Sequence, residues 1–138
     1  MVSFKDFHDG KFEGIWIEGA TAHVFVKTLQ GERFVLTATG VAALAADGFC
    51  AGNIILDIES TSAKDLTTRD ISDVRRYRPG MEDEHASKSL RKAQEGGLTM
   101  LAINPSYGGS CLLLCAGVGV ATRHAWLDRQ PHQPSAGR

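Results

Sequence analysis

Strict alternation of apolar and polar residues is the feature that most limits how this chain can fold. Within residues 21–28, the apolar Ala22, Val24 and Val26 occupy every second position, which is the period of a pleated strand. Residues 12–17 are rich in aromatic and β-branched types, and residues 34–39 alternate again. Short turn signals separate the three segments. We therefore predict an antiparallel β-meander over residues 12–39.

Two further segments extend the expected sheet. Residues 41–46 are mostly alanine, which favours a helix, although their position after three strands favours another strand. A short strand and a single turn of helix both fit them. The near-continuous apolar run at residues 54–58 predicts a strand near the centre of the sheet. The first half of the chain is thus expected to form four or five antiparallel strands.

The two-residue period gives way to a helical one in the middle of the chain. Thr67 and Asp70 have the spacing of a capping box with Asp in place of Glu, and a Pro-Gly pair follows at 79–80, so we predict a short helix near residues 68–77. A second helix is predicted over residues 82–95. Acidic residues fill its first turn, basic residues follow, and two glycines come after its last turn.

Strand composition returns at residue 98 and continues to residue 121. A turn-rich stretch at residues 104–109 divides it, so we predict a long closing hairpin. Gly117 and Gly119 lie inside its second strand, where glycine usually marks a bend or the close approach of a backbone or a large ring. Trp16 and Trp126 are the candidate rings.

These segments together predict a single α+β domain at residues 1–128: an antiparallel β-meander, two short helices and a closing β-hairpin. Residues 129–138 are expected to form a flexible tail. A chain of 138 residues fits one domain. Its 43% hydrophobic and 22% charged residues exclude a disordered or coiled-coil protein. Its net charge of -1 gives no reason to expect a nucleic acid or a membrane as partner.

Cysteine usage and the N-terminal residues predict a cytoplasmic location. Three cysteines are too few, and odd in number, for a disulfide scaffold, so we expect a reducing compartment. Two acidic residues and a histidine lie among residues 1–9, where a signal peptide would need an uninterrupted apolar stretch. The longest apolar run, residues 112–120, is about half of the ~20 residues that span a bilayer.

His8, Asp9 and Gly10 form the most conspicuous local string. A histidine beside a carboxylate suits general acid-base catalysis. Neighbours on a strand point to opposite faces, however, and Asp-Gly is a turn signal. We therefore interpret these residues as a structural turn motif in which the Asp9 side chain accepts hydrogen bonds from the backbone amides of the turn.

Cys111 and Cys115 share one face of the predicted strand, about 13 Å apart at a rise of ~3.3 Å per residue. This separation is too long for a disulfide or a shared metal ion, so both are expected to be buried, reduced and dispensable. No metal and no cofactor is predicted. A catalytic pair of a cysteine and a histidine stays open in three dimensions, without a local motif behind it. Its candidates are Cys50 or Cys111 with His8, His23 or His85.

Arg75, Arg76, Tyr77 and Arg78 form a dense cationic segment at the expected end of the first helix. Arginine and tyrosine often anchor protein interfaces, so we predict that these four residues bind a partner. A solvated ion-pair surface is the alternative, because several acidic residues lie nearby in the sequence; phosphate binding is a third interpretation. The chain contains no phosphate-binding loop, zinc-ligand set or serine-nucleophile motif.

Several strings in the first half resemble small, uncharacterised bacterial β-rich domains, some of them grouped as immunity proteins of polymorphic toxin systems. The resemblance covers residues 4–58. It rests on Phe7-His8-Asp9-Gly10, Gly14-Ile15, Phe34-Val35-Leu36 and Gly52-Asn53-Ile54-Ile55-Leu56. It implies a cytoplasmic bacterial protein that binds another protein, such as a toxin, and it assigns no catalytic residues.

The function expected from the sequence is non-catalytic binding through a protein-protein interface, with another protein or with a second copy of the chain. A small-molecule-binding domain is one alternative, and it requires a closed, partly apolar cavity in a curled sheet. An enzyme based on a cysteine and a histidine is the other alternative. It requires a pocket in which a perturbed titratable group contacts a second one.

Overall fold

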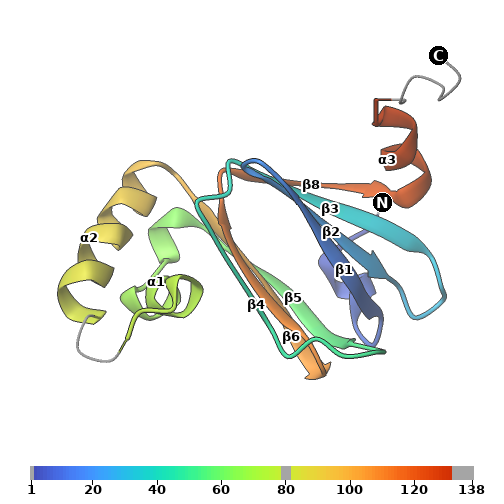
Figure 1. The fold of residues 1–138 in the computed structure, drawn as a ribbon, viewed down its shortest axis with the longest axis horizontal. Coiled ribbons are helices and arrows are strands. Elements are labelled where there is room, and N and C mark those ends of the chain that lie inside the picture. The colour runs from blue at the N-terminus through green and yellow to red at the C-terminus, as the bar shows by residue number, and fades with distance from the viewer. Residues whose placement is uncertain (1, 79–81, 132–138) are drawn as a thin grey trace, which may run out of the picture.

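Strands and helices alternate along the chain in blocks, around one antiparallel sheet (Figure 1). The computed structural model describes residues 2–78 and 82–131. Its elements are the short 3-10 helices η1 (Phe4–Phe7) and η2 (Ala63–Asp65), the strands β1 (Lys11–Glu18), β2 (Thr21–Lys27), β3 (Arg33–Thr39), β4 (Ala43–Asp47), β5 (Ile54–Thr61), β6 (Thr99–Tyr107), β7 (Ser110–Cys115) and β8 (Gly117–Thr122), and the helices α1 (Thr68–Arg75), α2 (Glu82–Glu95) and α3 (Arg123–Arg129). The predicted single α+β domain is confirmed.

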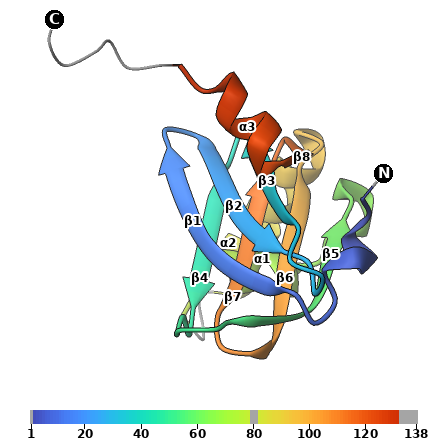
Figure 2. The ribbon, with the colours of Figure 1, turned by 90° about the vertical axis from the view of Figure 1, so that its right-hand side faces the viewer.

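Two of the strands continue directly from other strands, and this closes the sheet. In the order β4-β7-β6-β5-β1-β2-β3-β8, β4 and β8 stand at the two ends. Along the chain, β4 continues β3 beyond a bend and β8 continues β7. Because β3 pairs with β8 and β4 pairs with β7, the two bent strands stay paired on both sides of the bend. The sheet therefore rolls into two facing layers, β1-β2-β3-β8 and β5-β6-β7-β4 (Figures 1 and 2).

One extra residue on the β3–β4 side produces this bend. Thr39 faces Gly117, and Ala43 faces Leu114, so four steps along one strand match three along the other. Such a β-bulge bends the strand that carries the extra residue and increases its twist.

Backbone hydrogen bonds and a glycine carry the ladder through the bend. The Ala116 N–H donates to the Thr39 carbonyl and the Ala42 N–H to the Leu114 carbonyl, both at 2.8 Å. Gly40 has a φ of +59°, and a Cβ on it would lie 2.8 Å from the Cβ of Ala116. Glycine is thus required at this corner both by conformation and by space.

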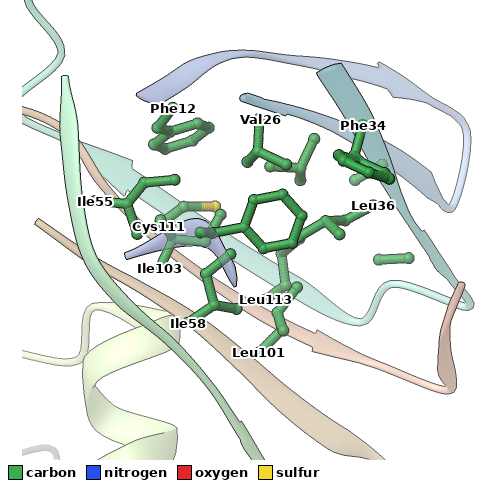
Figure 3. Packing of buried hydrophobic residues seen from close by; sticks show 14 of the residues in the cluster. Phe12, Val26, Phe34, Leu36, Ile55, Ile58, Leu101, Ile103, Cys111 and Leu113 are labelled. Atoms are coloured by element: carbon green, nitrogen blue, oxygen red, sulfur yellow. The ribbon is translucent and has the colours of Figure 1, made fainter. Parts of the chain in front are cut away.

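Apolar side chains fill the space between the two layers (Figure 3). Phe12 from β1, Leu36 from β3 and Leu113 from β7 are all fully or almost fully buried. Phe7 of η1 enters the same cluster, and its ring meets that of Phe34 edge to face with the centroids 5.6 Å apart. Burial of this cluster supplies the main driving force for folding.

The helices α1 and α2 pack on each other, and α1 also contacts the outer side of β4 and β7. The Thr67 hydroxyl accepts the Asp70 N–H at 3.2 Å, and the Asp70 carboxylate accepts the Thr67 N–H at 2.9 Å, which confirms the predicted capping box. Ile71 and Val74 are buried and pack with Leu114 in a second apolar cluster.

The helix and strand boundaries mostly follow the predictions. The helix α2 spans the predicted residues, and β5 lies in the interior of the sheet order, as expected. Residues 43–47 form a strand rather than a turn of helix. The helix α1 ends at Arg75, two residues early, because Arg76 adopts the left-handed conformation with a φ of +58°.

The closing segment differs from the prediction of one long hairpin over residues 98–121. The strands β6 and β7 form that hairpin, but the chain bends at Ala116 and β8 pairs with β3 instead. Gly117 and Gly119 are consistent with a bend here, but they do not indicate which strand β8 pairs with. The predictions also omitted α3, which holds Arg129 of the expected tail; residues 132–138 of that tail lie outside the described residues.

Replacement of Gly10 by alanine is expected to lower the free energy of unfolding by about 2 kcal/mol or more. A Cβ on Gly10 would overlap the Lys27 carbonyl and lie 2.9 Å from the Phe7 carbonyl oxygen, whereas a Cβ on Gly14 would have no atom within 4 Å. Gly14→Ala is the matched control and should change the unfolding free energy by less than about 0.5 kcal/mol. Urea denaturation measures both, and equal stability of the two variants would contradict the packing described at Gly10.

Candidate functional site

The segment predicted to bind a partner lies where α1 ends. Arg75 is the last residue of α1, and Arg76 caps the helix in the left-handed conformation. Both Nη atoms of Arg76 lie 3.4 Å from Oδ2 of Asp47, at the end of β4. Arg75, Arg76 and Arg78 are exposed, so the segment presents three guanidinium groups to solvent.

Tyr77 points inward, unlike its arginine neighbours. Its ring is half-buried and packs with the apolar cluster between α1 and the sheet. Its hydroxyl lies 2.7 Å from Oγ of Ser89, and its ring centroid is 6.2 Å from that of His85, both on α2. Tyr77 therefore fastens the segment to α2, and the sequence could not show this because the contact depends on how the two helices pack.

His8, Asp9 and Gly10 form the turn between η1 and β1. Asp9 has a φ of +61°, and its N–H donates to the Ile55 carbonyl at 2.9 Å. The predicted turn is formed, but the Asp9 carboxylate lies 3.5 Å from His8 Nε2, and within the described residues no backbone amide of the turn donates to it as expected. His8 Nδ1 donates to the Leu56 carbonyl at 2.6 Å, which ties the turn to β5.

The three cysteines are free, and two of them are buried as expected: Cys111 and Cys115. Burial raises the pKa of the Cys111 thiol to about 12 and shifts the pKa of Cys115 in the same direction. Cys50 is exposed, and its Sγ lies 3.5 Å from Oδ1 of Asn53. Within the described residues, no hydrogen bond joins a cysteine to a histidine, so the contact expected of a catalytic pair is not formed there.

An aromatic cluster lies on the outer face of β1-β2-β3-β8. The sequence suggested roles for Trp16, His23 and Trp126 separately, but not that the three side chains meet. Trp16, His23, Thr37 and Gly119 pair in register across these four strands. Trp126 of α3 covers the row, with its ring centroid 5.3 Å from that of His23 and 5.9 Å from that of Trp16. Trp126 and Gly119 line one cavity, but no atom lies within 4 Å of a Cβ built on Gly119, so the expected close approach of a ring to this glycine is not formed.

Two interactions place α3 over this face. The Thr122 hydroxyl caps the first turn of the helix. Arg123 donates to Glu13 of β1 at 3.1 Å, and its guanidinium lies 5.2 Å from the centroid of the Phe25 ring. A capping threonine followed by eight positions without glycine or proline, up to Pro131, was the signal in the sequence that could have predicted α3.

The contacts of His23 assign its tautomer. Its ring is 6% exposed, and Nδ1 lies 3.1 Å from Trp126 Nε1 and 3.3 Å from Thr37 Oγ1. An indole nitrogen can only donate, so Nδ1 accepts and the neutral ring carries its proton on Nε2. That nitrogen is buried and has no hydrogen-bond partner among the described residues. A buried donor without a partner is costly.

Two cavities lie near the residues described above, one beside the aromatic cluster and one beside the turn at His8. A cavity of about 270 Å³ adjoins the aromatic cluster, between β3, β8 and α3; its lining includes His23, Thr37, Gly119, Trp126 and Arg129. A wider groove of about 620 Å³ lies between η1 and the β2–β3 turn. Side chains of both charge signs line the groove, among them Lys5, Asp6, His8 and Glu32.

Comparison with protein-family models, with curated proteins and with solved structures found no match. In residues 2–78 and 82–131, no group of three or more His, Cys, Asp and Glu side chains is arranged to hold a metal ion. None of the helices in these ranges has the length and apolarity needed to span a bilayer.

Cys50 is expected to be the fast-reacting thiol of the folded protein. With a pKa of about 12, Cys111 is a thiolate in about one molecule in ten thousand at pH 8, and the thiolate is the reactive form. A thiol reagent added at pH 8 should label one cysteine rapidly, and Cys50→Ser should remove that label. Denaturation in urea should expose all three thiols, as the control. Rapid labelling of Cys111 or Cys115 in the folded protein would contradict their burial.

Proposed function

We propose that the protein acts by non-catalytic binding of another protein, and that the exposed arginines at the end of α1 contact an acidic surface on that partner. The observation that carries the proposal is the segment's geometry. Arg75, Arg76 and Arg78 are exposed, and the residue between them, Tyr77, is fastened to α2. A charged segment whose backbone is already fixed loses little conformational entropy on binding.

The ion pair between Arg76 and Asp47 is weak enough for a carboxylate on a partner to replace Asp47. The Arg76 and Asp47 side chains are 57% and 67% exposed, and ion pairs in such surroundings contribute little to stability. A carboxylate on a partner that excludes water would form a stronger charge-assisted hydrogen bond with the guanidinium. With an overall net charge of -1, attraction to an acidic partner depends on this local segment and not on bulk charge.

The resemblance to immunity proteins suggests one form of this proposal, in which the partner is a toxin. Immunity by binding needs a stable scaffold and an exposed recognition surface, and it needs no catalytic residues. A second copy of the chain is the other partner class. The small-molecule alternative requires a cavity inside the curled sheet, but apolar side chains fill that interior; the cavity beside α3 lies on the outer face instead.

Charge reversal at the segment tests the proposal. The tagged full-length protein is first used to isolate its partner from the native host, and the purified partner is then titrated by calorimetry. We expect the double variant Arg75→Glu/Arg78→Glu to lose affinity on the order of 100-fold. Tyr77 is unsuitable for this test because its truncation would also remove packing against α2.

Arg69→Glu is the control, since Arg69 is an exposed arginine on the same helix; it makes the same kind of substitution once and changes the net charge by half as much as the double variant. It should leave the affinity within about threefold of the wild type. Equal losses of affinity in both variants would indicate nonspecific electrostatic attraction to the partner and no defined interface. Unchanged affinity in the double variant would remove the segment from the interface, and turnover of a substrate by the purified protein alone would contradict a non-catalytic role.

A further inference from the structure

The cavity beside α3 combines one aromatic wall with hydrogen-bond donors. Trp126 supplies the aromatic wall. Arg129 contributes a positively charged side chain to the cavity lining. Within the described residues, no aspartate or glutamate lines the cavity. A cavity with this lining favours a ligand that carries negative charge and a flat apolar part.

Trp126 also determines which hydrogen-bond donors remain available to a ligand in the cavity. Because its indole N–H occupies the acceptor Nδ1 of His23 at 3.1 Å, the more distant Thr37 hydroxyl, at 3.3 Å, is not required as a donor to that nitrogen. The Thr37 hydroxyl hydrogen is then free to serve an acceptor in the cavity that Thr37 lines.

Gly119 keeps the floor of the cavity open. Its φ lies outside the left-handed region, and a Cβ built on it would meet no atom within 4 Å. Neither backbone conformation nor close packing therefore requires glycine here, although glycine weakens a strand. The space that a side chain would occupy is left to the cavity, where a flat ring could lie over the strand and against Trp126.

We propose that this cavity binds a small planar carboxylate, with the carboxylate directed to Arg129 and Thr37 and the ring between Gly119 and Trp126. This site is independent of the protein-binding segment: α3 lies at the opposite end of the molecule from α1 and α2 (Figure 1). Failure of one proposal therefore leaves the other unaffected.

The test uses indole-3-carboxylate as the probe and the neutral indole-3-carboxamide as its isostere. The chain has two tryptophans, so nitrogen-15 spectra of the full-length protein resolve two indole N–H signals. We expect the Trp126 signal to shift saturably below about 5 mM probe, and the carboxamide to bind about tenfold more weakly or worse. No saturable shift at that concentration, or equal affinity for the carboxamide, would overturn the proposal.

Two variants locate the binding. Gly119→Val should fill the floor and reduce probe affinity about tenfold or more, while Gly14→Val, at another strand glycine with open space around it, should preserve it. Arg129→Gln should remove the preference for the carboxylate over the carboxamide, and it decides the question even if Gly119→Val fails to fold. Unchanged affinity in Gly119→Val, or an unchanged preference in Arg129→Gln, would place the probe elsewhere and overturn the assignment.

Discussion

The paired bend in the two long strands is the constraint on which the rest of the structure depends. Backbone hydrogen bonds from Ala42 and Ala116 carry the ladder across the corner, so β4 and β8 extend strands that are already paired. The turn between β1 and β2 is tied to the same corner, since the Val41 N–H donates to the Ala20 carbonyl at 2.8 Å. Closing the sheet in this way encloses the apolar cluster and leaves fewer free strand edges than an open sheet would have.

The same bend separates the two surfaces that we propose to bind partners. The layer that contains β4 and β7 carries α1 and α2 on its outer side, and the layer that contains β3 and β8 carries α3 (Figures 1 and 2). One surface is a cationic segment fixed by Tyr77, and the other is a cavity whose aromatic wall is Trp126. Each depends on side chains held by regular elements, which favours precise recognition more than a mobile loop would.

Features that depend on neighbours along the chain were predictable from the sequence. The alternation in β2 and β3, the capping box at Thr67 and Asp70, and the charge order of α2 are local patterns with local physical causes. The fold class followed from their order. The Arg75 to Arg78 segment was also recognisable, because its composition alone distinguishes it from the rest of the chain.

Features that depend on contacts between distant residues were not predictable. The strand β7 pairs with β6, and beyond Ala116 its continuation β8 pairs with β3. The glycines after Ala116 indicate a bend but not the new partner. The sequence suggested His23 only as a possible catalytic partner of a cysteine. Its role follows from Trp126, which lies 103 residues away in the chain and on a helix that was not expected. Sequence periodicity reports which face a residue occupies but not what covers that face.

Hydrogen exchange at the bend tests the central claim, closure of the sheet, most directly. If the ladder continues through the corner, the amides of Ala42 and Ala116 should exchange as slowly as that of Val24 in the middle of β2, since all three would need global unfolding to open. Exchange of the Ala42 and Ala116 amides at the rate of exposed turn amides, while Val24 stays protected, would show two separate layers and contradict the closed sheet.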